Sequence, residues 1–137
     1  MLQALVLVSS LAQQPSAGAT QPYTPEQLAV GTIRSVISAQ ALYRQTHPRA
    51  GYACDVGTLV KVDMLSDVLS AGKPLDGYVF KVWCDTKATP QVTFRASAVP
   101  VKKAKGASLT VCTDETNVPR TIDGDVVACF AEGVPER

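Results

Sequence analysis

The first strong pattern in the chain is helical and lies between residues 24 and 47. Apolar residues recur there every three or four positions, so that they share one face of a helix: Val30, Ile33, Ile37 and Ala41, with Val36 and Tyr43 beside them. This spacing is typical of an amphipathic helix that packs on one side only.

Both ends of this helix are marked in the sequence. Thr24 is placed to act as the N-cap, Pro25 takes the first helical position, and Gln27 follows the cap by three residues, as in a capping box. At the other end, Pro48 disfavours helical backbone angles at His47. The sequence therefore predicts a helix over residues 25–46.

Beyond this helix the apolar period is first helical and then changes to two. A short second helical region is predicted from apolar residues at mostly three- and four-residue intervals: Leu59, Val62, Leu65, Val68 and Leu69. Alternating segments then predict strands over residues 78–83, 92–98, 109–113 and 118–122. The turn signal Asp123-Gly124 predicts a return strand over residues 126–130, followed by a frayed tail. The expected fold is α+β, with a long N-terminal helix packed on a small antiparallel β-meander.

The N-terminal residues predict export. The apolar run Leu2–Ala12 is too short for a membrane-spanning helix, which needs roughly 20 residues. It is typical of the apolar region of a secretory signal, with small residues at 10–12 or 17–19 for cleavage. We therefore expect a signal peptide and the start of a linker at 1–19, linker at 20–24, a globular domain at 25–131 and a flexible tail at 132–137. A mis-assigned start codon and a flexible tail are the alternatives for the N-terminal run.

Composition narrows the class of partner. The chain has 137 residues, of which 46% are hydrophobic and 18% charged, which fits one domain with a modest core. The net charge of +1 argues against nucleic acid, whose binding depends on clustered cations. One basic cluster, Lys102, Lys103 and Lys105, has no aromatic residue for base stacking and is interpreted as a solvated loop.

The four cysteines form an even set in a chain with an export signal, which indicates disulfides. Three pairings are open. We favour Cys54 with Cys84 and Cys112 with Cys129, because each bond would tie neighbouring elements. The alternative, a zinc site of all four cysteines, normally has two closely spaced pairs, whereas the spacings here are long. A secreted or periplasmic location follows from the disulfides and the signal.

No catalytic signature is found in the sequence. His47 is the only histidine and has no carboxylate nearby in sequence, so we interpret it as a surface residue at a helix end. The serines lack the Gly-x-Ser-x-Gly pattern of a nucleophile elbow, and no Gly-rich phosphate loop is present. We expect a protein that is not an enzyme.

Two groups of residues are candidates for binding. Four carboxylates lie around two predicted turns, where oxygen ligands could hold calcium: Asp114, Glu115, Asp123 and Asp125. Their spacing is not that of an EF-hand, and such residues commonly cap backbone groups in turns. Four aromatic residues could line a ligand groove or form half-buried core: Tyr52, Tyr78, Trp83 and Phe94. Arg34 and Arg44 are expected at the solvated edge of the first helix.

Three segments, in this order, resemble the ectodomain of bacterial type IV pilin-like and pseudopilin proteins. They are Ala29–Gln40 with Tyr43 and Gly51-Tyr52-Ala53; Leu69–Lys73 leading to Gly77–Phe80; and Thr113–Arg120 with its Asp-Glu-Thr turn. The similarity spans roughly residues 25–120. It implies the same helix-on-meander fold, and it adds to the calcium hypothesis, since some major pseudopilins bind calcium in C-terminal loops. The chain departs from the family in lacking the prepilin leader and the apolar stem of about twenty residues.

The combined expectation is an exported, non-enzymatic pilin-like protein with a binding or assembly role, as an accessory of a type IV pilus or type II secretion system. Its partners would be pilus or secretion proteins, with no nucleic acid, no transmembrane helix in this chain, and no cofactor other than calcium. The alternatives are a truncated minor pilin whose start lies upstream, and a small secreted hydrolase or ligand- or calcium-binding module that uses the Asp114–Asp125 region.

Overall fold

The computed structural model describes residues 22–69 and 72–137. The predicted signal segment at 1–19 and the first linker residues lie outside these ranges. The described chain is α+β, as predicted. Its helices are α1 (Pro25–Thr46), α2 (Val56–Lys61), the short 3₁₀ helix η1 (Asp67–Leu69) and α3 (Val126–Glu132). Its strands are β1 (Tyr78–Trp83), β2 (Arg95–Pro100), β3 (Thr110–Asp114), β4 (Arg120–Ile122) and β5 (Val134–Pro135).

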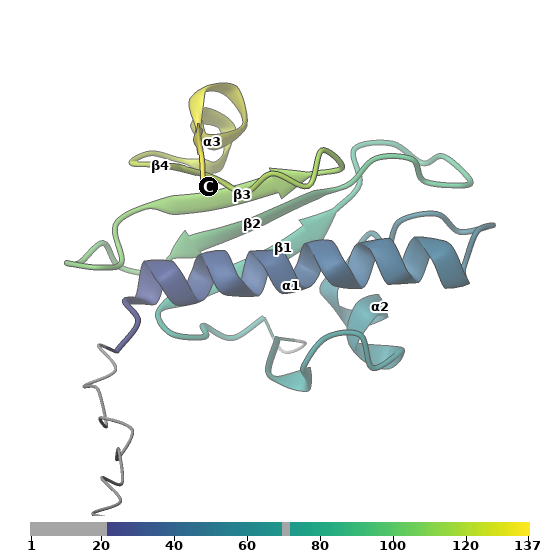
Figure 1. The fold of residues 1–137 in the computed structure, drawn as a ribbon, viewed down its shortest axis with the longest axis horizontal. Helices are drawn as coiled ribbons and strands as arrows, with labels where there is room; N and C mark the ends of the chain where they lie inside the picture. The colour runs from purple at the N-terminus through teal and green to yellow at the C-terminus, as the bar shows by residue number, and fades with distance from the viewer. Residues whose placement is uncertain (1–21, 70–71) are drawn as a thin grey trace, which may run out of the picture.

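The strands form one antiparallel sheet in the order β1-β2-β3-β4-β5, which is a meander. Figure 1 shows α1 lying across one face of this sheet. In that view α3 lies at the top, next to β3 and β4, and α2 lies at the bottom, below α1. In β1 the side chains of Tyr78, Phe80 and Val82 are buried on the side of α1. Because successive strand residues point to opposite faces, Val79, Lys81 and Trp83 lie on the other face.

Helix α1 has the predicted bounds and the predicted start. The Thr24 hydroxyl accepts from the Gln27 N–H at 3.2 Å, and the Gln27 side chain accepts from the Thr24 N–H at 2.9 Å. This is the capping box expected from the sequence. These local hydrogen bonds therefore fix where α1 begins, and they place Glu26 in its first turn.

The buried face of α1 is rotated from the predicted one. Its buried residues are Ala29, Ile33, Val36, Ala39 and Gln40. Ala41, predicted to face the core, is exposed, whereas Val30, Ile37 and Tyr43 pack at the edge of the core. The rotation brings two alanines and a glutamine onto the buried face of the helix. Small side chains allow close approach, and the glutamine amide has partners there, as described below.

The core lies between α1, the α2–η1 region and the inner face of the sheet. Its largest fully buried members are Tyr78, Phe94, Ile33 and Leu59. Leu65 and Leu69 belong to the same cluster, so the predicted second helical region does pack inward. It is divided into α2 and η1 by Asp63, whose φ of +57° does not continue a helix.

Two predictions for the C-terminal region are wrong. Residues 126–132 form helix α3 where a strand was expected, because the Asp125 side chain accepts from the Ala128 N–H at 2.8 Å and caps a helix. The tail does not fray either, since β5 pairs with β4 and the Glu136 N–H donates to the Pro119 carbonyl at 2.8 Å. The second strand also begins at Arg95 rather than at 92.

Candidate functional site

All four cysteines are joined in disulfides, Cys54 to Cys84 and Cys112 to Cys129, the pairs favoured from the sequence. Cysteines bonded in this way offer neither a zinc thiolate nor a nucleophile. The first bond ties the loop after α1 to the residue that follows β1. The second ties β3 to α3, so that it holds a helix, not the expected strand, against the outer face of the sheet.

The four carboxylates proposed for calcium are not brought together. Asp114 is the last residue of β3 and accepts from the Thr116 N–H at 2.9 Å. Asp123 binds the Lys103 ammonium at 2.7 Å, and Asp125 caps α3. Since Thr110 pairs with Ile122 in the antiparallel ladder, Asp123 lies at the opposite end of β3 from Asp114 and Glu115. Within residues 22–69 and 72–137, no three His, Cys, Asp or Glu residues are grouped as metal ligands.

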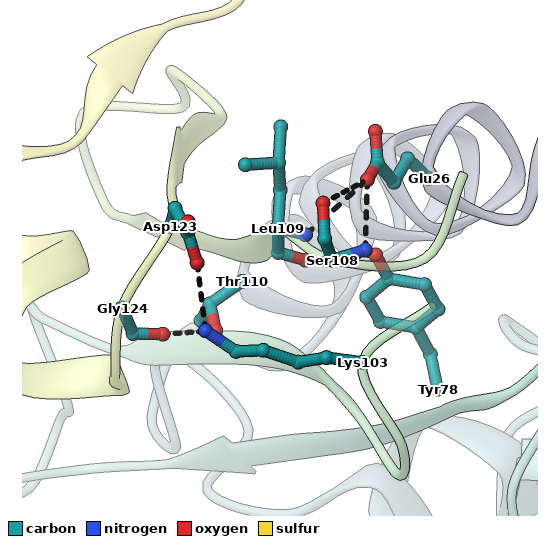
Figure 2. Close-up of polar contacts among 8 residues, drawn as sticks. All are labelled: Glu26, Tyr78, Lys103, Ser108, Leu109, Thr110, Asp123 and Gly124. Carbon is teal, nitrogen blue, oxygen red and sulfur yellow. Dashed lines mark hydrogen bonds and ion pairs between the residues drawn. The ribbon is translucent and has the colours of Figure 1, made fainter. Parts of the chain in front are cut away.

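Glu26 is a further half-buried carboxylate, and its hydrogen bonds give it a structural role. Figure 2 shows Glu26, in the first turn of α1, accepting from the Ser108 N–H at 2.8 Å, the Ser108 hydroxyl at 3.0 Å and the Leu109 N–H at 3.3 Å. The Tyr78 hydroxyl donates to the Leu109 carbonyl at 2.7 Å. Burial, and then the charge of Glu26, raises the pKa of Tyr78 to about 12. These groups fix α1 to the sheet and leave no free acid or base.

Gln40 is another polar residue of α1 with a structural role, and the sequence analysis did not identify it. Its amide is fully buried, donates to the Ala53 carbonyl at 2.7 Å and accepts from the Ala53 N–H at 2.8 Å. The preceding turn is equally constrained, because Gly51 has a φ of +76° and a Cβ there would lie 2.1 Å from the Gln91 carbonyl oxygen. The Gly-Tyr-Ala segment that resembles pseudopilins is thus a tightly bonded scaffold turn. The apolar face predicted for α1 did not include position 40, so the sequence pattern gave no signal for this contact.

His47 lies at the end of α1, as expected. Its ring stacks on Tyr43 with the centroids 4.3 Å apart, and its Nδ1 lies 3.2 Å from the Tyr43 carbonyl. These contacts close the last turn of the helix. They give the imidazole no acidic partner for catalysis.

The aromatic residues divide between two faces of the sheet. Tyr52, Tyr78 and Phe94 are core residues, and the Arg44 guanidinium lies over the Tyr52 ring. Trp83 is different, because it lies on the face opposite α1. There its ring meets that of Phe130 edge-on, with the centroids 5.9 Å apart.

Trp83 forms part of an exposed groove between the sheet and α3, which we call the outer groove. It is lined by Trp83, Arg95, Val126, Val127, Phe130 and Ala131. Trp83 and Arg95 are partners in the β1–β2 register, so their side chains share a face. The Cys112–Cys129 bond holds the third element, α3, over that face.

Cations and rings alternate along the outer groove and beside it. The Lys81 ammonium lies 5.3 Å from the Trp83 ring centroid, and the Arg95 guanidinium lies 4.6 Å from that of Phe130. Arg95 also binds the Asp85 carboxylate at 2.9 Å. Such a surface can bind a partner that carries apolar side chains and negative charge, and it offers no nucleophile or acid–base pair for a reaction. Sequence reasoning missed it because Phe130 was assigned to a strand.

Two further findings bear on what the chain is. None of the helices in the described ranges is long and apolar enough to span a membrane. In comparisons with known proteins, no family model matches the chain, and no curated protein and no solved structure matches it either.

Proposed function

We propose that this protein is an exported, non-enzymatic protein of pilin-like fold that binds or assembles with proteins of a type IV pilus or type II secretion system. The outer groove carries the proposal. It presents Trp83, Phe130 and Val127 beside the cations Lys81 and Arg95, on elements that a disulfide holds in place. Half-buried aromatic side chains beside an exposed arginine are typical of the centres of protein interfaces.

The pilin-like part of the proposal is supported by two observations. The three segments that resemble pseudopilins occur in the family's order, and α1 lies across an antiparallel meander as that resemblance implies. The export part is supported by the two disulfides, which persist in the periplasm or outside the cell. A periplasmic or secreted location follows.

Export is tested with a fusion of residues 1–24 to alkaline phosphatase, an enzyme that is active only where its own disulfides can form. We expect activity in whole bacteria, and none from the same fusion without residues 1–19. An inactive fusion that is stably produced would overturn the proposed export.

Binding is tested by photo-crosslinking from a defined position in the outer groove. A crosslinking amino acid at Val127, which is 76% exposed, is compared with one at Val101, which is 60% exposed and lies in the β2–β3 connection. Each labelled protein is mixed with the purified pilin, pseudopilin and secretion-system ectodomains of the same genome. We expect a crosslink to one of them from Val127 and none from Val101. Absence of any crosslink from Val127 would refute the accessory role.

A further inference from the structure

We propose that the outer groove binds the acidic segment of a second copy of this chain, so that copies associate head to tail. The acidic segment is defined here as residues 55–69, which include α2 and η1. The inference rests on the binding role proposed above and names an occupant for the same site. It is argued from charge, exposed apolar side chains and the placement of the two surfaces.

On the groove side, one cation has no carboxylate partner among the described residues, and one apolar side chain is largely exposed. Lys81 is exposed, and in the part of the chain that the structure describes its ammonium contacts the Trp83 ring but no carboxylate. Val127 is the second residue of α3 and is 76% exposed, although it lines the groove. The surface is therefore complementary to a partner that carries a carboxylate next to an apolar side chain.

The acidic segment has that chemistry. It contains three aspartates and one lysine, and so is net negative. The Asp63 side chain is exposed in the turn after α2, and it has no bonded partner within the described ranges. Val68, five residues later, is 54% exposed, and between them Met64 lines a shallow hollow together with Asp63 and Leu65.

The two surfaces lie on opposite faces of the sheet. Leu59, Leu65 and Leu69 anchor the acidic segment in the core with Ile33 and Phe80, on the face covered by α1. The outer groove lies on the other face, under α3, and Figure 1 shows α2 and α3 on opposite sides of the molecule. One copy cannot bring its own two surfaces together. A contact between different surfaces of identical chains is heterologous, and it produces open chains of copies unless a ring closes.

The interactions between the two surfaces predict a weak association of copies that depends on the salt concentration. The apolar contact of Val68 and Val127 with Trp83 supplies the attraction. The pairing of Lys81 with Asp63 sets orientation, and its contribution falls as salt screens exposed charges over about 10 Å at 0.1 M. We therefore expect concentration-dependent assembly that weakens at high ionic strength.

Two single variants test the geometry. Val127→Glu blocks the groove, and Val68→Glu blocks the acidic segment. By sedimentation velocity at low salt, wild type should form a concentration-dependent series of oligomers, and each variant alone should be monomeric. An equimolar mixture should form a 1:1 dimer and nothing longer, because one intact groove meets one intact acidic segment. Val101→Glu, at an exposed valine outside both surfaces, should assemble like wild type.

Charge exchange tests the pairing. Lys81→Glu and Asp63→Lys should each weaken association by about tenfold, and the double variant should recover it, because in a head-to-tail contact the exchanged charges meet again. Circular dichroism and a count of free thiols confirm that every variant is folded and oxidised.

Three outcomes would overturn the inference: wild type that is monomeric at all concentrations, variants that still assemble, or a mixture that does not pair. A monomeric wild type together with a crosslink from Val127 to a secretion protein would refute this inference and leave the proposed function standing. Head-to-tail assembly without export or a crosslink would refute the proposed function alone.

Discussion

Glu26 accepts hydrogen bonds from both the backbone N–H and the hydroxyl of Ser108, which lies 82 residues further along the chain. The Glu26 N–H in turn donates to the Gly106 carbonyl at 2.9 Å. The first turn of α1 is therefore bonded directly to the segment that enters β3. This connection closes the domain around its core, since it joins the first helix to the middle of the sheet.

Replacing Glu26 with alanine should lower the free energy of unfolding by about 2 kcal/mol. The Ser108 and Leu109 donors would lose a charged acceptor in a half-buried site, and hydrogen bonds to charged groups contribute more than neutral ones. Urea denaturation followed by circular dichroism measures the change. Glu132→Ala, at an exposed glutamate at the end of α3, is the control and should change stability by less than about 0.5 kcal/mol. Equal effects of the two variants would contradict the role given to Glu26.

The raised pKa of Tyr78 predicts a loss of stability in alkali. Its native pKa of about 12 lies above the usual value of 10, so the folded protein holds this proton more tightly than the unfolded chain. The stabilisation is complete below pH 10 and is lost as the pH rises toward 12, which amounts to about 3 kcal/mol. Tyr78→Phe removes the titration, so its stability should fall less over the same range. Parallel curves for wild type and Tyr78→Phe in urea denaturation at several pH values would refute the assignment.

A feature of this fold can be predicted from the sequence when residues close together in the chain determine it. The capping box of Thr24 and Gln27 and the stop at His47-Pro48 are local, and α1 has the predicted bounds. The contacts of Glu26 with Ser108 and of Gln40 with Ala53 join residues that are 82 and 13 positions apart, and no local sequence pattern indicates them.

The error at α3 has a different physical origin. Val126 and Val127 favour a strand by intrinsic preference, and Asp123-Gly124 is typical of a hairpin turn. The structure instead uses Asp125 as an N-cap, and the Cys112–Cys129 bond fixes the resulting helix on the sheet. Because Phe130 then faces Trp83, the outer groove could not be predicted once residues 126–130 were assigned to a strand.

Calcium should bind weakly or not at all to the four carboxylates first considered. Asp114 and Asp123 lie at opposite ends of β3, and Asp123 and Asp125 already bind Lys103 and the start of α3. A ligand stabilises a fold only when it is present well above its dissociation constant. We therefore expect the melting temperature to change by less than about 1 °C on adding millimolar calcium to protein treated with a chelator. A rise of several degrees would restore the calcium hypothesis.

Gln40→Ala should be among the most destabilising single changes on α1, with a loss of about 3 kcal/mol. The variant leaves both the N–H and the carbonyl of Ala53 without their partner in a buried site, and it opens a cavity under the helix. Gln45→Ala, on the exposed face of the same helix, is the matched control and should be nearly neutral. Both are compared by urea denaturation. A small effect of Gln40→Ala would mean that the turn at Gly51–Ala53 is held by other contacts.

The two disulfides should differ in how readily they are reduced, because only one can be approached by a thiolate. Cys112 and Cys129 are fully buried, whereas Cys54 is exposed. With a limiting amount of reductant followed by alkylation, mass spectrometry should find labels on Cys54 and Cys84 before any on the other pair. The disulfides close loops of 30 and 17 residues, and each should stabilise the folded protein by about 3 to 4 kcal/mol. The Cys54→Ser/Cys84→Ser variant should therefore melt about 10 °C lower. Simultaneous labelling of all four cysteines would show that reduction proceeds only through global unfolding.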